Sequence, residues 1–372
     1  MKHFFTKTKM LLLILSIILT FALIPVWGCG ESVNLKSLKP ISLENTSVEK
    51  YEIPSQSQIY EITKKLSDTA IGPVHPLTLQ EFIEKKENES GHKYTIGCLY
   101  YKSPKGKFIV YSILPNSFLD GKVKTGDTIL KINGVSPDKF IPQKEGQDIT
   151  VTYESQKDGK IKTIKSKVGI IHMPSAYGDL LANGKIVYIA IKNFNKDTYK
   201  QLSELLETVN NNSIIIDLRN TTGDDLDTML QSLSLFIPSK QVGFLRVKSS
   251  VLPLYVKSSN IDVANHINPK HVIIIVNSKT GGVAEFFAYV LQRNQYRIAG
   301  EEIKDSVVLN KYYRFNNSIL SVPYAIAINN NKKSIELMPN IPIKDDGITC
   351  DCSDKAKLLH KVELILLSED SD

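Results

Sequence analysis

Hydroxyl, basic and glycine residues lie together in one segment of this chain, Ser278-Lys279-Thr280-Gly281-Gly282. The segment follows an apolar run from His271 to Val276 and precedes a helical pattern with Glu285 in its first turn. Covalent catalysis by a hydroxyl requires a base that activates it and N–H donors directed at the developing oxyanion. This strand-to-helix turn is preceded by two hydroxyl groups, those of Ser278 and Thr280, with the basic Lys279 between them.

Alternating apolar strands and amphipathic helices must position that turn. Strands predicted at 186–191 and 213–218 flank a helix at 198–209, which forms a βαβ unit. Further predicted elements are a helix at 226–236, a strand at 271–276, a helix from 282, a strand ending at 298–301 and a last helix at 356–367. The C-terminal part is therefore expected to be an α/β core.

Two smaller regions precede this core. From 58 to 87, apolar residues at helical spacing predict a pair of helices interrupted at Gly72-Pro73. Short alternating runs at 108–113, 128–132, 149–153 and 161–168, separated by turn residues, predict a small all-β unit. The expected domains are a helical segment at 58–91, a β domain at 92–168 and the core at 169–367.

The N-terminus has the pattern of an export signal. Lys2, Lys7 and Lys9 precede an apolar run from Met10 to Ile24, which is too short for an ordinary membrane-spanning helix. Val26-Trp27-Gly28-Cys29 resembles a bacterial lipobox, which implies a signal peptide at 1–28 and lipid on Cys29. An uncleaved membrane anchor is the alternative. Both place the remaining chain outside the cytoplasmic membrane, after a polar tether at 29–57.

Charge and cysteine content exclude several kinds of partner. The formal net charge of +7 includes three lysines of the leader, and the other basic residues are scattered among acidic ones, so no nucleic-acid partner is predicted. Cys98 is alone in an apolar segment and is expected to be buried. Cys350 and Cys352 have no His or Cys neighbours at ligand spacing, so we predict no metal and no cofactor, and leave their disulfide state open.

Several motifs, in order along the chain, resemble the C-terminal processing (tail-specific) serine peptidases, in particular their retinol-binding-protein-like and tricorn-like branch. The segment Asp217-Leu218-Arg219-Asn220-Thr221-Thr222-Gly223-Asp224 resembles that family's Asp-Leu-Arg-Asn-Asn-x-Gly-Gly. Leu320-Ser321-Val322-Pro323 matches its late Leu-Ser-Val-Pro segment. The resemblance covers residues from about 58 to 367 and implies an α/β (α+β) peptidase core of the crotonase-like type.

The resemblance also implies that the nucleophile is missing. In the branch, a serine stands three places before the first glutamate of the helix, and the corresponding residue here is Gly282. Thr280 is the fallback candidate for a displaced nucleophile, although we expect its hydroxyl to cap the following helix instead.

The base of the family is also absent from its expected place. A lysine is expected six residues after Gly300, where this chain has Ser306, and the glutamine four residues later is Asn310. Lys304 is the fallback candidate for a shifted base. None of the seven histidines lies in a motif that assigns it this role.

The oxyanion hole departs from the family pattern as well. Its donors would come from the position of Asp224, next to Gly223, and from Val283. An ionised carboxylate at about 4 Å from an oxyanion, at an effective dielectric constant near 20, opposes it by about 4 kcal/mol. That repulsion is comparable with the contribution of one donor.

The β domain resembles a PDZ domain. Leu114-Pro115-Asn116-Ser117 and the run from Gly126 to Gly134 match segments of the PDZ domains in this family. The carboxylate-binding loop would then consist of Ile96, Gly97, Cys98 and Leu99. Successive N–H groups of such a loop bind a peptide C-terminus while the peptide adds a strand to the sheet.

We therefore expect an extracytoplasmic lipoprotein, lipid-anchored to the bacterial cell membrane through Cys29, with a catalytically inactive peptidase core. Its expected partners are polypeptide C-termini or a partner protein such as an active peptidase. Two alternatives stay open: an active serine-type endopeptidase with an unassigned nucleophile or base, and a structural envelope lipoprotein.

Overall fold

The computed structural model describes residues 39–43, 46, 51–209, 212–257, 267–303, 306–344 and 357–369. The predicted signal peptide, Cys29, Lys304, Cys350 and Cys352 lie outside these residues. Among the helices described, none is both long and apolar enough to cross a membrane.

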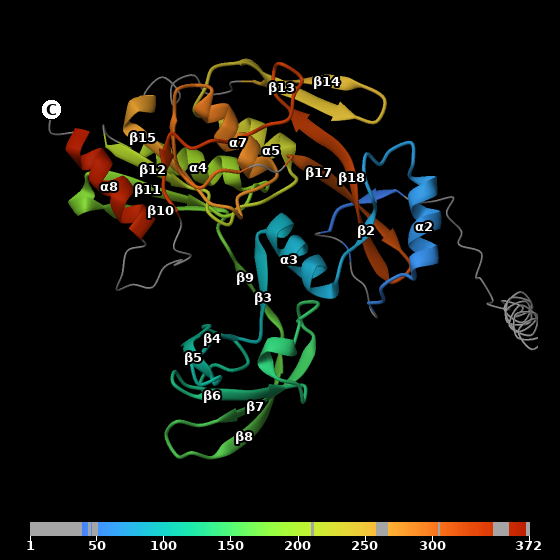
Figure 1. Ribbon diagram of the computed structural model, residues 1–372. Helices are drawn as coiled ribbons and strands as arrows, with labels where there is room; N and C mark the ends of the chain where they lie inside the picture. Colours follow the sequence, from blue (N-terminus) through green and yellow to red (C-terminus); the bar gives the residue numbers. More distant parts are fainter. Residues whose placement is uncertain are drawn as a thin grey trace, which may run out of the picture. The chain divides into compact units, whose positions relative to one another are not determined.

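A six-stranded sheet forms the centre of the C-terminal part (Figure 1). Its strands, in spatial order, are β10 (Ala176–Leu181), β11 (Ile186–Ile191), β12 (Ser213–Asp217), β15 (Val272–Val276), β16 (Arg297–Gly300) and β19 (Ile341–Pro342). All neighbours are parallel except β10, which is antiparallel at one edge. Every residue of β12 and β15 is buried, as expected of parallel strands covered on both faces.

Helices cover both faces of this core sheet. They are α4 (Thr198–Glu207), α5 (Leu226–Leu233), α7 (Val283–Gln292) and α8 (Lys357–Glu369). The first three pack with Ile214 and Ile216 in one hydrophobic cluster, whereas α8 packs with Ile215 on the opposite face. Neighbouring residues of one strand thus supply two separate cores. The predicted α/β core is confirmed, with helix ends that differ from the predicted ones by up to a few residues.

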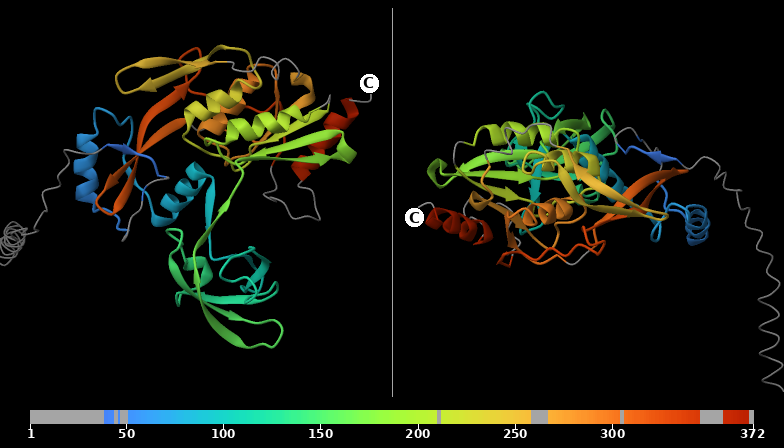
Figure 2. Two further views of the ribbon diagram at one scale, coloured as in Figure 1. Left: turned by 180° about the vertical axis from the view of Figure 1, so that it is seen from behind. Right: turned by 90° about the horizontal axis from the view of Figure 1, so that it is seen from above.

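A second sheet lies beside the core and includes the N-terminal part of the described chain (Figures 1 and 2). Its order is β1 (Pro40–Ile41), β17 (Val308–Phe315), β18 (Ser318–Ile328), β13 (Lys240–Val247) and β14 (Val251–Val256), with β2 (His75–Pro76) paired to β18. The predicted helical pair consists of α2 (Gln56–Lys65) and α3 (Leu79–Ser90). Phe82 and Ile83 of α3 pack against Ile319 of β18, so α3 is part of the same body as this sheet.

The β domain contains a five-stranded antiparallel sheet, as predicted. Its strands are β4 (Cys98–Lys102), β5 (Phe108–Ile113), β6 (Thr128–Ile132), β7 (Asp148–Glu154) and β8 (Ile161–Lys167), in that spatial order. The pair β3 (His92–Thr95) and β9 (Gly169–His172) forms the connection at which the chain enters and leaves the domain. Three short 3₁₀ turns complete the elements: η2 (Pro137–Lys139), η3 (Ala182–Gly184) and η4 (Pro269–His271).

The tether predicted over 29–57 is wrong at residues 40–43. Residues 40–41 form β1 on the edge of β17, and the side chain of Leu43 is buried. Glu89 of α3 accepts hydrogen bonds from the backbone N–H of Leu43 at 2.8 Å and from the hydroxyl of Ser42 at 2.6 Å. The few apolar residues of this polar segment thus contact residues that are distant in sequence, and a local sequence pattern does not indicate such contacts.

Candidate functional site

The strand-to-helix turn after β15 is held by the hydroxyl of Thr280. Thr280 is only 2% exposed; its Oγ1 donates to the carbonyl O of Leu218 at 2.8 Å and accepts from the N–H of Asn277 at 3.1 Å. The N-cap of α7 is Gly282, so the cap predicted for Thr280 is wrong. Because its hydroxyl bridges two turns inside the protein, Thr280 is also poorly placed to be a nucleophile.

Gly282 itself lacks space for a side chain. Its backbone has φ 58° and ψ −134°, a region that residues with a Cβ rarely occupy. A Cβ built there would overlap the carbonyl O of Gly223 and would lie 3.3 Å from the Gly223 nitrogen. The position expected for the serine is therefore occupied by the backbone of the neighbouring loop.

The two halves of the expected oxyanion hole are hydrogen-bonded to each other. The N–H of Val283 donates to the carbonyl O of Gly223 at 3.0 Å, and the N–H of Gly281 donates to the carbonyl O of Thr221 at 3.0 Å. An oxyanion would need the Val283 N–H, which already has an acceptor. In this arrangement the hole is filled by the protein's own carbonyl.

Asp224, at the other expected donor position, is bound by β17 and approached by a lysine from α3. Its Oδ1 accepts hydrogen bonds from the backbone N–H and the Nδ2 of Asn310, both at 3.1 Å. Its Oδ2 accepts from the hydroxyl of Tyr312 at 2.5 Å and lies 3.6 Å from the Nζ of Lys85. Asn310, which the motifs predicted as the counterpart of the family's glutamine, therefore holds Asp224 in place.

The expected base position carries no basic group. Ser306 is exposed and lies just before β17, and Lys304 lies outside the described residues.

The Asp-Leu-Arg motif after β12 has a structural role. The Nε of Arg219 donates to both carboxylate oxygens of Asp217 at 3.0 Å, and the Nη2 of Arg219 donates to Oδ2 of Asp217 at 2.6 Å. The hydroxyl of Tyr188 donates to the same Oδ2 at 2.7 Å. This buried set fixes the turn that leads to Gly223.

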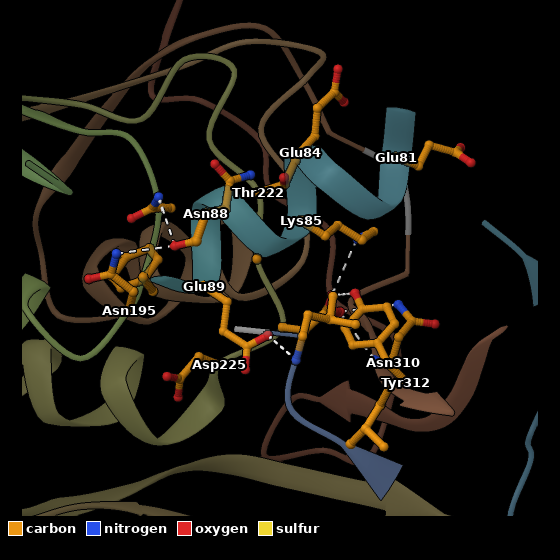
Figure 3. Close-up of a pocket in the computed structure, with 16 residues that line it drawn as sticks. Glu81, Glu84, Lys85, Asn88, Glu89, Asn195, Thr222, Asp225, Asn310 and Tyr312 are labelled. Carbon is orange, nitrogen blue, oxygen red and sulfur yellow. Dashed lines mark hydrogen bonds and ion pairs between the residues drawn. The ribbon is translucent and has the colours of Figure 1, made fainter. Parts of the chain in front are cut away.

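A pocket of about 380 Å³ lies directly beside this turn (Figure 3). Its walls come from α3, from β1 and the residues after it, from β17 and from the loops at 193–195 and 222–225. The charged residues lining it are Glu81, Glu84, Glu89, Asp224 and Asp225, with Lys85 as the single basic one. Figure 3 shows Lys85 extending from α3 toward Asn310 and Tyr312. The pocket is therefore negative overall.

The predicted carboxylate-binding loop lies at the start of β4. Ile96, Gly97 and Cys98 are buried, and Leu99 is half-buried. The N–H of Gly97 donates to the Oγ1 of Thr95 at 3.2 Å. One N–H of the loop is thus bonded within the domain, and the binding of a peptide C-terminus here stays a prediction.

Burial and the adjacent Asp224 raise the pKa of Tyr312. Unfolded tyrosine ionises near pH 10, so above this pH the unfolded chain loses a proton that the folded chain keeps. The free energy of unfolding should therefore fall as pH rises, by up to about 1.4 kcal/mol per pH unit for each such tyrosine. Urea unfolding between pH 9 and 11 should show a shallower decline for Tyr312→Phe than for the parent. Tyr255→Phe, at a half-exposed site, should keep the parental slope, and equal slopes for all three would contradict the burial of Tyr312.

Residues 185–347, which contain the turn, the Gly223 loop and β17, match the family model "Peptidase family S41". This match identifies an S41 domain at residues 185–347, which is less than half of the chain. The turn after β15 and the Gly223 loop, which the motifs predicted to be the catalytic positions, both lie within the matched residues.

The chain is similar to bacterial proteins of two Staphylococcus species. A protein of Staphylococcus aureus named "Probable CtpA-like serine protease" is 25% identical over 208 residues, 53% of this chain and 41% of that protein. A protein of the same name from Staphylococcus haemolyticus is 26% identical over 243 residues, 60% of this chain and 48% of that protein. The chain thus matches less than half the length of these relatives.

Two solved structures are similar to this chain at low sequence identity. A Bacteroides fragilis protein described as an S41 protease has a TM-score of 0.48 at 16% identity, covering 87% of this chain and 100% of that one. The photosystem II D1 C-terminal processing protease has a TM-score of 0.43 at 13% identity, covering 80% and 84%.

Three residues of the site were not predicted from the sequence: Lys85, Glu89 and Tyr312. Tyr312 is two residues after Asn310 in the same strand, and strand periodicity could have placed both on one face. Lys85 and Glu89 lie on α3, about a hundred residues before the S41 match begins, and no motif marks them.

Proposed function

We propose that this protein is a non-catalytic member of peptidase family S41 that binds polypeptide segments in the pocket beside Gly223. The observation that carries the proposal is the carbonyl of Gly223. It accepts the Val283 N–H and lies where the Cβ of a nucleophile at position 282 would be. One backbone carbonyl thus lies where the reactive side chain would be and occupies the N–H donor that an oxyanion would need.

The peptidase rate is expected to be far lower than that of an active serine peptidase. Removal of the nucleophile from a serine protease typically lowers kcat by about 10⁶-fold, and loss of the base adds little because the two groups act together. The buried Thr280 and the exposed Ser306 offer no substitute in the described part of the chain. These departures support a binding role over the alternative of an active endopeptidase.

The charge of the pocket supports one class of ligand. Five carboxylates and one lysine line it, and a concave site of one sign concentrates ligands of the opposite sign. We therefore propose that the bound segment carries Lys or Arg side chains. A free C-terminal carboxylate would be repelled there, so C-terminus binding would depend on the predicted loop at 96–99.

Two measurements on residues 30–372 test this proposal. Cleavage of an unfolded protein such as casein should be undetectable. In fluorescence anisotropy, an extended lysine-rich peptide should bind more tightly than an acidic peptide of equal length, and Glu84→Gln should weaken its binding about threefold to fivefold. Glu204→Gln, on the exposed face of α4, is the matched control.

The outcomes separate the three candidate roles. Cleavage by the parent protein would support the endopeptidase alternative. Absence of cleavage with no charge-dependent binding would support a structural lipoprotein. Equal loss of affinity in Glu84→Gln and Glu204→Gln would show that binding occurs outside the pocket.

We further propose that the chain is lipid-anchored outside the cytoplasmic membrane through Cys29. The basic n-region, the apolar run and the lipobox-like segment support this location. Metabolic labelling with a fatty acid should modify the parent chain and leave Cys29→Ala unlabelled. Labelling of both forms would place the lipid elsewhere.

A further inference from the structure

The positive charge of the chain is concentrated in the β domain. Residues 92–168 contain fourteen lysines and seven acidic residues, a net charge of +7, whereas residues 29–372 as a whole carry +4. The remainder of that chain is therefore net negative, in keeping with its acidic pocket. The β domain is a basic module attached to an acidic body.

One face of the β-domain sheet combines this charge with exposed apolar side chains. Cross-strand pairing aligns Tyr101, Ile109, Thr128, Glu154 and Ile161 in one row across all five strands. Directly paired residues share a face of a sheet, so this row lies on one side. Its two ends are exposed, Tyr101 by 49% and Ile161 by 68%. We call this side of the sheet the outer face.

Neighbouring positions extend the same face. Tyr111, two residues after Ile109, is 54% exposed, and its ring centroid lies 6.3 Å from that of Tyr101. In the adjoining rows, Lys131 pairs with Thr152, and Lys165 pairs with Thr150. The outer face thus presents two tyrosines at one edge of the sheet, Ile161 and Lys165 on the opposite edge strand, and Lys131 on the central strand β6.

The acidic residues of the outer face are already paired. Glu154 lies 3.9 Å from the Nζ of Lys107, and Asp148 lies 3.4 Å from the Nζ of Lys167. Lys131 and Lys165 are exposed and have no carboxylate within 4.0 Å among the described residues. Their charge is therefore available to an external anion.

We propose that the outer face of the β domain binds an anionic lipid bilayer surface. Lysines attract anionic headgroups, while tyrosine and isoleucine side chains insert at the headgroup boundary. A purely electrostatic partner such as a wall polyanion would make no use of an exposed Ile161. The contact is separate from the lipid proposed at Cys29 and would fix how the domain lies on the membrane.

Vesicle co-sedimentation of residues 30–372, which lack the lipid and retain every described element, tests this inference. The protein should bind vesicles of phosphatidylcholine with 30% phosphatidylglycerol and should not bind pure phosphatidylcholine. Each lysine near such a surface contributes about fivefold in affinity, so Lys131→Gln with Lys165→Gln should weaken binding about 25-fold. Ile161→Ser should weaken it separately, and added salt should weaken the parent more than the double variant.

The matched control is Lys248→Gln with Lys270→Gln, two exposed lysines of the C-terminal part with the same change in net charge. These substitutions should leave vesicle binding within twofold of the parent. Equal losses in the two double variants would overturn the assignment of the outer face. If the protein binds heparin as tightly as it binds vesicles, and Ile161→Ser does not weaken that binding, the ligand is a soluble polyanion and not the bilayer. Absence of any vesicle binding would also refute the proposal.

Discussion

Replacement of Gly282 by serine is expected to restore no peptidase activity and to lower the free energy of unfolding by about 2–4 kcal/mol. The motif resemblance predicts the family's nucleophile at this position, so the substitution supplies the hydroxyl that the prediction requires. The structure supplies no room for it, because the new Cβ would overlap the carbonyl O of Gly223.

The overlap, and not the backbone angle alone, decides this expectation. Serine nucleophiles of other hydrolases lie on sharp strand-to-helix turns with strained backbones, so a positive φ can be tolerated. Here the Gly223 carbonyl would have to turn away, which would break its hydrogen bond from Val283. The flanking Asp224 is held by Asn310 and Tyr312, which opposes that movement.

Urea unfolding and a casein cleavage assay of Gly282→Ser measure the two effects. Gly281→Ser is the matched control, because a Cβ at residue 281 would meet only Thr222 at 3.9 Å and its φ lies outside the left-handed region. This variant should lose less than about 1 kcal/mol. A Gly282→Ser protein that is as stable as Gly281→Ser, or that cleaves casein, would show that the Gly223 loop opens readily.

Replacement of Asp224 by alanine is expected to lower the free energy of unfolding by about 2–3 kcal/mol. The substitution removes three hydrogen bonds to a carboxylate and leaves the Tyr312 hydroxyl and the Asn310 amide without their acceptor. Hydrogen bonds to charged groups contribute about 1.5–3 kcal/mol each, and partial hydration of the pocket reduces the sum. Asp224 thus connects the Gly223 loop to β17 through side-chain hydrogen bonds.

A double-mutant cycle isolates this contact. Asp224→Ala, Tyr312→Phe and the combined variant should show a coupling free energy of about 1–2 kcal/mol in urea unfolding. Asp227→Ala, an exposed residue of the first turn of α5, should change stability by less than about 1 kcal/mol. A coupling near zero would indicate that Asp224 and Tyr312 do not share a hydrogen bond in solution.

Much of the fold follows from local pattern. β12 and β15 are runs of branched apolar residues, which is the pattern of central parallel strands, and both lie where they were predicted. In the β domain, β7 alternates between buried and more exposed residues, and turn residues bound the predicted runs, so β5 and β6 begin and end as expected. Ordered motifs then indicated the family, which the match over 185–347 supports.

Predictions that depended on distant contacts were less successful. The segment around Leu43 was expected to be a tether because its composition is polar. It is instead hydrogen-bonded to Glu89 of α3, which is 46 positions later in the chain, and β1 pairs with the still more distant β17. Thr280 was expected to cap the next helix, but α7 begins at Val283 and its N-cap is Gly282. The Thr280 hydroxyl instead meets the carbonyl of Leu218, 62 residues earlier in the chain.

The sequence by itself determined that serine, lysine and glutamine are absent from positions 282, 306 and 310, where the resemblance predicts them. Reading the residue at a position requires no knowledge of its contacts. The sequence also determined the order of the core elements, since hydrophobic periodicity is a local property. Only the tertiary structure decided that the Gly223 carbonyl fills the place of nucleophile and oxyanion, and that α3 gives the pocket its charge. Both facts arise from backbone and side-chain contacts between segments about 60 to 220 residues apart, and no local pattern specifies such contacts.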